Sequence, residues 1–257
     1  MASIANPQSR AILFDVTRCI GCRSCAKACK EAHGFPGTGD ETELDAVTYT
    51  VVLDEGNDRY LRRMCMHCDT PSCVSACPVG ALEKTALGPV TYDGAKCMGC
   101  RYCMVACPFG VPRYEWSKAN PVVRKCDGCI GRRKAGKPTA CAEACPAEAT
   151  VEGTREQLLA EARRRIAESP GKYHPAIYGE KEVGGTNVLV LSPVPFDQLG
   201  LKVGLGAQPL PNLTWAALSK IPKVVGFGCV GLSAIYWITH RRQEVAAAEC
   251  RGKENHR

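Results

Sequence analysis

Aromatic residues are scarce in this chain, at 6% of 257 residues, and the sequence contains no recognisable catalytic motif. We find no nucleophile paired with a general base, no glycine-rich loop for phosphates and no pterin-binding signature. The formal net charge is +7, but the lysines and arginines are scattered and form no basic stripe interleaved with aromatic residues. These absences argue against a catalytic chain and against a nucleic-acid-binding protein.

Cysteine, by contrast, is abundant, with 18 residues. A small domain with a thin hydrophobic core needs another source of stability, and metal held by cysteines commonly supplies it. Thiols must stay reduced while such a site is assembled, which predicts maturation in the cytoplasm wherever the protein finally resides. We therefore expect one or two small domains built around metal, and an apoprotein that is largely unfolded.

The most specific motif lies at residues 97–108, where Cys97, Cys100 and Cys103 are followed by Cys107 and Pro108. This spacing is the bacterial ferredoxin pattern, in which three thiolates hold one [4Fe–4S] cluster and the fourth reaches a second cluster. A glycine between the first two cysteines lets backbone N–H groups approach the cluster. The proline fixes the direction in which the chain leaves.

The same pattern occurs four times and uses all but two of the cysteines, in quartets that we number as motifs one to four. The quartets are Cys19, Cys22, Cys25 and Cys29; Cys65, Cys68, Cys73 and Cys77; Cys97, Cys100, Cys103 and Cys107; and Cys126, Cys129, Cys141 and Cys145. Motifs two and four carry extra residues between their second and third cysteines. Four [4Fe–4S] clusters are the expected number, and Cys229 and Cys250 are expected to be free thiols.

Two other uses of cysteine fit these motifs less well. Zinc sites of four cysteines usually join two Cys-x-x-Cys pairs across a long loop, which suits neither the third cysteine nor the final Cys-Pro. Cysteines three residues apart also have poor geometry for disulfides with one another. The alternative from a different functional class is a membrane adaptor whose cysteines bind zinc and only support an interface. Such a protein would be colourless and free of iron.

The spacing alone leaves open how the motifs pair. Each cluster of a two-cluster ferredoxin takes three cysteines from one motif and the last cysteine of another, and the links 77–97 and 107–126 are nearly equal in length. One hint comes from the apolar segments 12–15 and 90–93, each a predicted strand that ends in aspartate before a motif. It favours pairing motif one with motif four and motif two with motif three.

Other segments predict the structure around the motifs. Residues 47–53 and 60–61, joined by a turn, indicate a β-hairpin, and residues 188–191 indicate a strand added to one of the modules. A capping box at Thr154 and Gln157 opens a helix that ends near residue 169. The apolar stripe of this helix consists of Leu158, Ala162 and Ile166. We expect an α+β fold with two bacterial-ferredoxin-like modules.

Several residues near the motifs have predicted supporting roles. His67 lies inside Cys-Met-His-Cys, but four cysteines already serve as ligands, so we expect it beside a cluster and not on the iron. Tyr102 and Phe109 are predicted to pack against the clusters as core. Residues 132–134 and Lys137 are predicted to form a basic loop that faces solvent or a partner.

Near the C-terminus the chain changes character. Residues 224–239 carry no charge, and with residues 221–223 they reach the length of a membrane-spanning helix, about 17–25 residues. The alternative is a buried helix of a soluble protein. Glycines that suit close helix packing and aromatic residues that suit a membrane interface occur here. They are Gly226, Gly228 and Gly231, with Trp215, Tyr236 and Trp237.

The chain is thus expected to have five parts. These are a double ferredoxin-like four-cluster domain at 1–152, a capping helix and added strand at 153–192, a linker at 193–220, a transmembrane helix at 221–240 and a basic tail at 241–257. More basic residues follow the helix than precede it, which favours a cytoplasmic tail. We therefore expect a single-pass protein of the inner membrane with its cluster domain on the periplasmic side.

With these features, the chain resembles the four-cluster iron–sulfur (beta) subunits of membrane-bound formate dehydrogenases and the similar subunit of hydrogenase-2 type enzymes. The resemblance covers residues 10–242 and rests on the segments 65–68, 99–108, 153–158 and 178–186. It implies a non-catalytic subunit of anaerobic respiration that passes electrons from a molybdenum or tungsten catalytic subunit. The acceptor would be a membrane cytochrome b or another quinone-reactive subunit.

The resemblance also implies which cysteines hold each cluster. Set A is Cys19, Cys22, Cys25 and Cys145; set B is Cys29, Cys126, Cys129 and Cys141; set C is Cys65, Cys68, Cys73 and Cys107; and set D is Cys77, Cys97, Cys100 and Cys103. All sixteen cysteines are then expected to be iron ligands. This assignment pairs motif one with motif four and motif two with motif three.

Between the two relatives, the N-terminus favours the formate dehydrogenase subunit, since residues 1–11 carry no twin-arginine leader. Two alternatives remain. One is the equivalent subunit of a membrane-bound [NiFe] hydrogenase. The other is a cytoplasm-facing polyferredoxin of a quinone oxidoreductase.

Overall fold

A computed structural model of the chain describes residues 9–119 and 121–254, with side chains up to residue 248. The chain divides into two units, Met1–Pro211 and Asn212–Arg257, and each is described by itself. All sixteen cysteines of the four motifs belong to the first unit. Cys250 lies outside the described side chains, and Cys229 is exposed in the second unit.

A three-stranded sheet organises the first unit. Its central strand β1 (Arg10–Asp15) pairs antiparallel with β8 (Thr150–Thr154) and parallel with β9 (Val188–Leu191). The strands predicted at 12–15 and 188–191 are therefore confirmed, and the second is indeed an added strand. Residues 11–14 of β1 are all apolar, because both faces of the sheet are covered at this strand.

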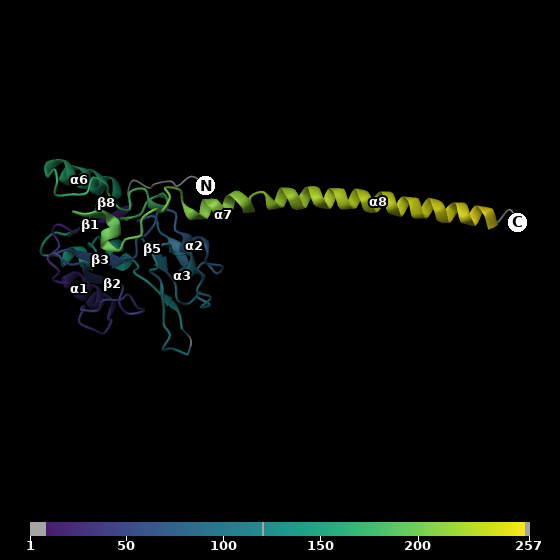
Figure 1. The fold of residues 1–257 in the computed structure, drawn as a ribbon. Helices are drawn as coiled ribbons and strands as arrows, with labels where there is room; N and C mark the ends of the chain where they lie inside the picture. The colour runs from purple at the N-terminus through teal and green to yellow at the C-terminus, as the bar shows by residue number, and fades with distance from the viewer. Residues whose placement is uncertain (1–8, 120, 255–257) are drawn as a thin grey trace. The chain divides into compact units, whose positions relative to one another are not determined.

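The two faces of β1 belong to different cores. Ala11 and Leu13 pack with Leu158 and Ala162 of α6 (Arg155–Glu168), which lies over β8 and β1 in Figure 1. The capping box at Thr154 is present, so the predicted start of this helix is confirmed. Ile12 and Phe14, on the other face, join a second core that contains cysteines of motifs one, two and four.

The remaining elements of this unit are short and surround the motifs. The predicted hairpin is confirmed as β2 (Thr50–Asp54) and β3 (Tyr60–Met64), with Asp54 opposite Tyr60. Two further antiparallel pairs are β4 (Leu82–Lys84) with β5 (Val90–Tyr92) and β6 (Arg113–Tyr114) with β7 (Val123–Arg124). The short helices are α1 (Ser24–His33), α2 (Ser72–Ser75), α3 (Tyr102–Ala106), α4 (Ile130–Lys134), α5 (Ala140–Glu143), η1 (Glu182–Gly184) and η2 (Phe196–Leu199).

Of two predictions about single residues, one is wrong and one is confirmed. Tyr102 is 61% exposed and is not core. It opens α3 and shares a helix face with exposed Val105, whereas the next residue, Cys103, turns inward. Phe109 is confirmed as core, since it packs against the cysteine-containing core with its ring centroid 6.4 Å from that of Tyr178.

The predicted basic loop is a helix with one buried arginine. Arg133 in α4 is 8% exposed, and its Nε lies 3.2 Å from a carboxylate oxygen of Glu152 in β8. Its guanidinium also donates to the backbone oxygen of Arg10 at 3.0 Å. Arg133 therefore joins α4 to the sheet, while Lys134 and Lys137 stay exposed as predicted.

The second unit contains most of α7 (Leu210–Leu218) and all described residues of α8 (Ile221–Glu254), which Figure 1 shows as two consecutive helices. Among the described residues, the helical stretch Leu210–Ala248 is long and apolar enough to cross a membrane, by length and composition. α8 continues beyond residue 240 into the basic segment, and residues 255–257 lie outside the described part. Phe227, Val230 and Trp237 are exposed around it, as expected of a helix that is apolar on every side.

Candidate iron–sulfur centres

Each cysteine motif is a loop that runs into a short helix. The third cysteine of every motif is the second residue of that helix, so the helix places one thiol on its inner side. These cysteines are Cys25 in α1, Cys73 in α2, Cys103 in α3 and Cys141 in α5, and all four are buried. The same local geometry therefore recurs in motifs with different spacing.

A left-handed residue precedes the second cysteine of every motif. It is glycine in three motifs, Gly21, Gly99 and Gly128, with φ of 67°, 73° and 66°. This conformation turns the chain so that the N–H of Gly99 donates to Cys97 Sγ, and that of Gly128 to Cys126 Sγ, both at 3.4 Å. In motif two the position is held by His67, with φ of 47°.

The structure brings the thiols of sets A and D together at two cavities. Cys145 lies beside Cys19 and Cys25, although more than a hundred residues separate it from them in the chain. One cavity is lined by all four cysteines of set A, and another by all four of set D. In set D, Cys77 of motif two is a neighbour of Cys103 of motif three.

Sets B and C gather in the same crossed manner. Cys129 has Cys141 and Cys29 as neighbours, and Cys126 also adjoins Cys29. In set C, Cys68 is next to the other three members of the set. These are Cys65, Cys73 and Cys107. Every group thus combines three thiols of one motif with the last thiol of another.

The four groups are also neighbours in a definite order. Cys25 of set A lies near Cys141 of set B, and Cys126 of set B lies near Cys65 of set C. Cys73 of set C in turn lies near Cys103 of set D. The sulfur groups therefore follow one another from A through B and C to D.

The protonation chemistry of these thiols is consistent with cluster binding. Burial raises the pKa of Cys25 to about 11 and that of Cys73 to about 12, and neighbouring thiols add to the effect by repulsion. Burial likewise raises the pKa of Cys129 to about 12. Four such thiols ionise together only when cationic iron compensates their charge. The donor set of each group therefore fits a [4Fe–4S] cluster.

Arg62 of β3 places a buried cation between sets A and B. It is 5% exposed, and its guanidinium donates to Thr50 Oγ1 at 2.9 Å and to Thr150 Oγ1 at 3.2 Å. Burial lowers the pKa of Arg62, but nearby thiols, Cys141 and Cys25 foremost, raise it by more, so the net shift is upward. A buried guanidinium that is held by neutral hydroxyl groups is costly unless negative charge lies nearby. Clusters ligated by thiolates would supply that charge.

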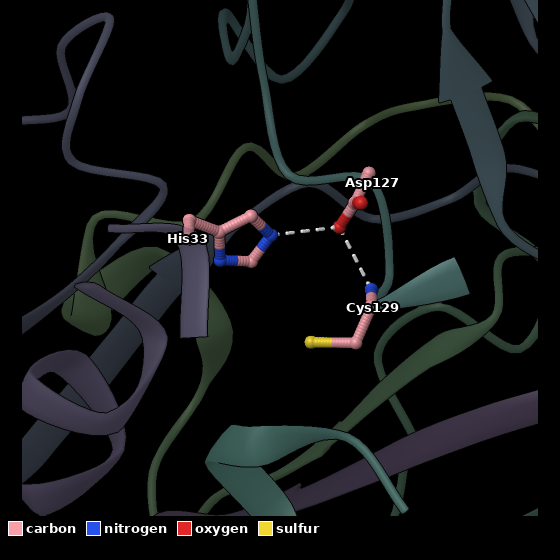
Figure 2. Close-up of side chains that lie close together, drawn as sticks. All are labelled: His33, Asp127 and Cys129. Atoms are coloured by element: carbon pink, nitrogen blue, oxygen red, sulfur yellow. Dashed lines mark hydrogen bonds and ion pairs between the residues drawn. The ribbon is translucent and has the colours of Figure 1, made fainter. Parts of the chain in front are cut away.

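Figure 2 shows a second feature of set B, in which His33, Asp127 and Cys129 lie together. His33 Nε2 is 3.1 Å from Asp127 Oδ1, and the same oxygen accepts the N–H of Cys129 at 2.8 Å. The Asp127 carboxylate, followed by Cys29, raises the pKa of His33 to about 10. Cys129 Sγ belongs to set B, so we interpret the trio as support for that set and not as a separate metal site.

Sequence reasoning missed both of these groups. His33 follows Cys29 by four residues on α1, and that spacing could have placed it beside the thiol, since His33 Nδ1 lies 3.9 Å from Cys29 Sγ. Asp127 lies between two cysteines of motif four, and this position could likewise have placed it beside set B. Arg62 gave no local signal, because its neighbours in sets A and B and its hydrogen-bond partner Thr150 of β8 are far from it in the sequence.

The fold and its sulfur groups define a protein of the polyferredoxin class, with several iron–sulfur sites in one chain. Two family models, each described as a 4Fe-4S dicluster domain, match residues 11–78 and 57–155. Two matches to a two-cluster domain agree with the presence of [4Fe–4S] clusters as cofactors.

Comparison with curated proteins narrows the class. The hydrogenase-2 operon protein HybA of Escherichia coli O157:H7 is 38% identical over 241 residues, which covers 76% of this chain and 73% of HybA. The iron-sulfur subunit of the nitrate-inducible formate dehydrogenase of Escherichia coli K12 is 36% identical over 236 residues, 84% of this chain and 79% of the relative. A protein of Nitratidesulfovibrio vulgaris is 43% identical over 257 residues, 94% of this chain and 70% of that protein.

The chain therefore belongs to the family of iron–sulfur subunits found in formate dehydrogenase and hydrogenase-2 type complexes. The named relatives are iron–sulfur subunits or hydrogenase operon proteins, and none is named as a catalytic chain. This agrees with the electron-transfer role and the lack of catalytic machinery inferred from the sequence.

Proposed function

We propose that this chain is the electron-transfer subunit of a membrane-bound oxidoreductase and that it holds four [4Fe–4S] clusters. Sets A, B, C and D are the proposed ligand sets, and residues 1–152 the proposed double ferredoxin-like domain. Each cluster, when bound, accepts and releases electrons at a potential that its protein surroundings adjust. The catalytic partner we propose is a molybdenum or tungsten formate dehydrogenase subunit, with a cytochrome b or other quinone-reactive subunit as the acceptor.

The observation that carries this proposal is the order of the sulfur groups, in which neighbouring thiols link A to B, B to C and C to D. A linear series of sites is what an electron relay requires, whereas a structural scaffold gains nothing from it. The link between Cys126 and Cys65 matters most, because it joins the two modules.

Exposure along the series supports the same proposal. All four cysteines of set B are buried, whereas Cys22 of set A is exposed and Cys97 and Cys100 of set D are partly exposed. Exposed apolar residues lie next to both outer sets, Ile20 at set A and Met98 at set D. We propose that partner subunits contact the chain at these two ends, where electrons enter and leave.

The second unit is the proposed membrane anchor. Its apolar helical stretch supports a single pass through the inner membrane, with residues 153–192 as the proposed capping helix and added strand and 193–220 as the proposed linker. The charge pattern favours a cytoplasmic tail at 241–257 and a periplasmic cluster domain. Protease treatment of spheroplasts tests this orientation. A cluster domain that is cut only after the cells are lysed would contradict a periplasmic location.

A second candidate for the partner is a [NiFe] hydrogenase. The 38% identity with HybA favours it, and the same relay would then accept electrons from hydrogen oxidation. Affinity purification of the complex and identification of the copurifying large subunit decide between the two. A complex with neither type of catalytic subunit would contradict both.

Cys103→Ser tests the relay itself. Cys103 is buried in set D, so its loss should remove or convert one cluster and stop electron flow to quinone. Substrate oxidation with an artificial dye should persist in the partner subunit. The measurements are quinone reduction in membranes, dye reduction, and iron and acid-labile sulfide per chain.

The matched control is Cys229→Ser, an exposed thiol of α8 outside the four sets, which should leave both activities unchanged. Undiminished quinone reduction in Cys103→Ser would remove set D from the path. A colourless native protein that contains zinc in place of iron would overturn the whole proposal.

A further inference from the structure

His67 stands where the other three motifs have glycine. Its backbone has φ of 47°, in the left-handed region that disfavours side chains with a β-carbon. The fold needs only the turn, and glycine provides that turn without strain in motifs one, three and four. A strained residue kept in place of glycine points to a use for its side chain.

The hydrogen bonds of the ring determine its tautomer. His67 is 3% exposed, and its Nδ1 accepts the backbone N–H of Val90 at 3.0 Å. A backbone N–H can only donate, so Nδ1 carries no proton. The proton of a neutral imidazole then resides on Nε2, which makes Nε2–H a donor.

That donor has no acceptor within the described part of the chain. Nε2 of His67 is buried and forms no hydrogen bond there, either to a thiol sulfur or to any other acceptor. Buried donors are seldom left unpaired, because the lost hydration is not replaced. The charged groups that face the ring are Lys84, Lys125 and Arg133, a setting that attracts an electron-rich acceptor.

The position of the ring narrows the choice of acceptor. His67 belongs to the loop of set C, yet a Cβ built on Gly128 would lie 3.4 Å from His67 Cε1. Gly128 lies between Cys126 and Cys129 of set B. The imidazole therefore reaches from one module to the other, at the junction where Cys126 and Cys65 are neighbours.

We propose that His67 Nε2–H donates a hydrogen bond to a sulfur atom of a [4Fe–4S] cluster at the junction of sets B and C. The bond stabilises the reduced cluster, which carries more negative charge, and so raises its reduction potential. His67 is thus a cofactor-binding residue that adjusts the step between the modules. This inference rests on the proposed function, since it needs clusters in those sets.

The test is His67→Gly in the complete, cluster-loaded complex. This variant installs the residue that the other motifs use, so it keeps the left-handed turn. It removes the Nε2–H donor together with the Nδ1 acceptor of the Val90 N–H. We expect all four clusters to assemble and one reduction potential to fall in an EPR-monitored redox titration, with the other three unchanged. In protein labelled with [¹⁵N]histidine, pulsed EPR of the reduced clusters should lose one weak ¹⁵N coupling.

His174→Asn is the control, because the ring of His174 contacts Phe196, which lies outside the cysteine motifs. It should leave the potentials and the ¹⁵N couplings unchanged. A His67→Gly complex with unchanged potentials and couplings, or with all four potentials shifted together, would overturn the role of His67. Absence of iron and sulfide from the native protein would instead overturn the proposed function, so the two failures are distinguishable.

Discussion

Two aspartates that look alike in the sequence have very different surroundings. Asp15 and Asp93 each follow a short apolar strand and precede a cysteine motif. The Asp15 side chain is fully buried and accepts hydrogen bonds from Arg165 at 2.9 Å and Tyr173 at 3.0 Å. Asp93 is half exposed, caps a turn through the N–H of Ala95 at 2.9 Å and forms a surface ion pair with Lys96.

The difference reflects how each module is stabilised. The module of motifs one and four has β1, β8, β9 and α6, which enclose a core without any cysteine. The module of motifs two and three has two-stranded sheets and a small core of five buried residues, two of them cysteines. The first module can retain structure through protein packing, whereas the second depends on what its cysteines bind.

Removal of the clusters should produce the largest effect and separate the modules. After anaerobic chelation of iron, amides of α2, α3, β4 and β5 should exchange hydrogen almost as fast as in an unfolded chain. Amides of β1, β8 and α6 should keep partial protection, because the α6 core needs no metal. This result would sharpen the expectation from composition that the apoprotein is largely unfolded.

Hydrogen exchange with mass spectrometry, read against the untreated protein, measures the contrast. Uniform loss of protection across both modules would show that the α6 core is too weak to persist alone. Uniform retention would show that neither module depends on metal.

Asp15→Asn should have the next largest effect. It removes the charge that faces buried Arg165, which costs about 3–5 kcal/mol for a buried pair. We expect the lower end of this range, because Arg165 keeps Glu161 at 2.7 Å. The free energy of opening of β1, from native-state hydrogen exchange, measures the loss.

Asp93→Asn is the matched control in the other module. Its stability should change by no more than about 0.5 kcal/mol, as for an ordinary surface substitution. Equal effects of the two substitutions would mean that the buried network around Asp15 does not stabilise the first module.

Thr154→Ala should have a smaller effect than Asp15→Asn. It removes the side-chain acceptor for the N–H of Gln157 and should destabilise α6 by about 1 kcal/mol. The local effect is expected in α6 and β8, while the second module should not respond. Thr154→Ser keeps the hydroxyl and should restore most of the stability, and a Ser variant as unstable as the Ala variant would rule out capping as the cause.

Features with a local cause were predictable from the sequence. The capping box at Thr154, the hairpin of β2 and β3 and the spacing of the cysteines each depend on residues close together in the chain. The predictions for Tyr102 and Arg133 both failed, because each depended on which face of a short helix packs inward. Tyr102 follows the solvent face of α3, and Arg133 is buried only because α4 meets β8.

By itself, the sequence determined that the chain carries four cysteine motifs and the strands, turns and helix starts around them, since short-range spacing dictates these. Only the tertiary structure decided that Arg62 lies between sets A and B and that His67 faces the loop of Gly128. It also decided the order of the four sulfur groups. Such neighbours are far apart along the chain, and no local preference encodes the packing that brings them together.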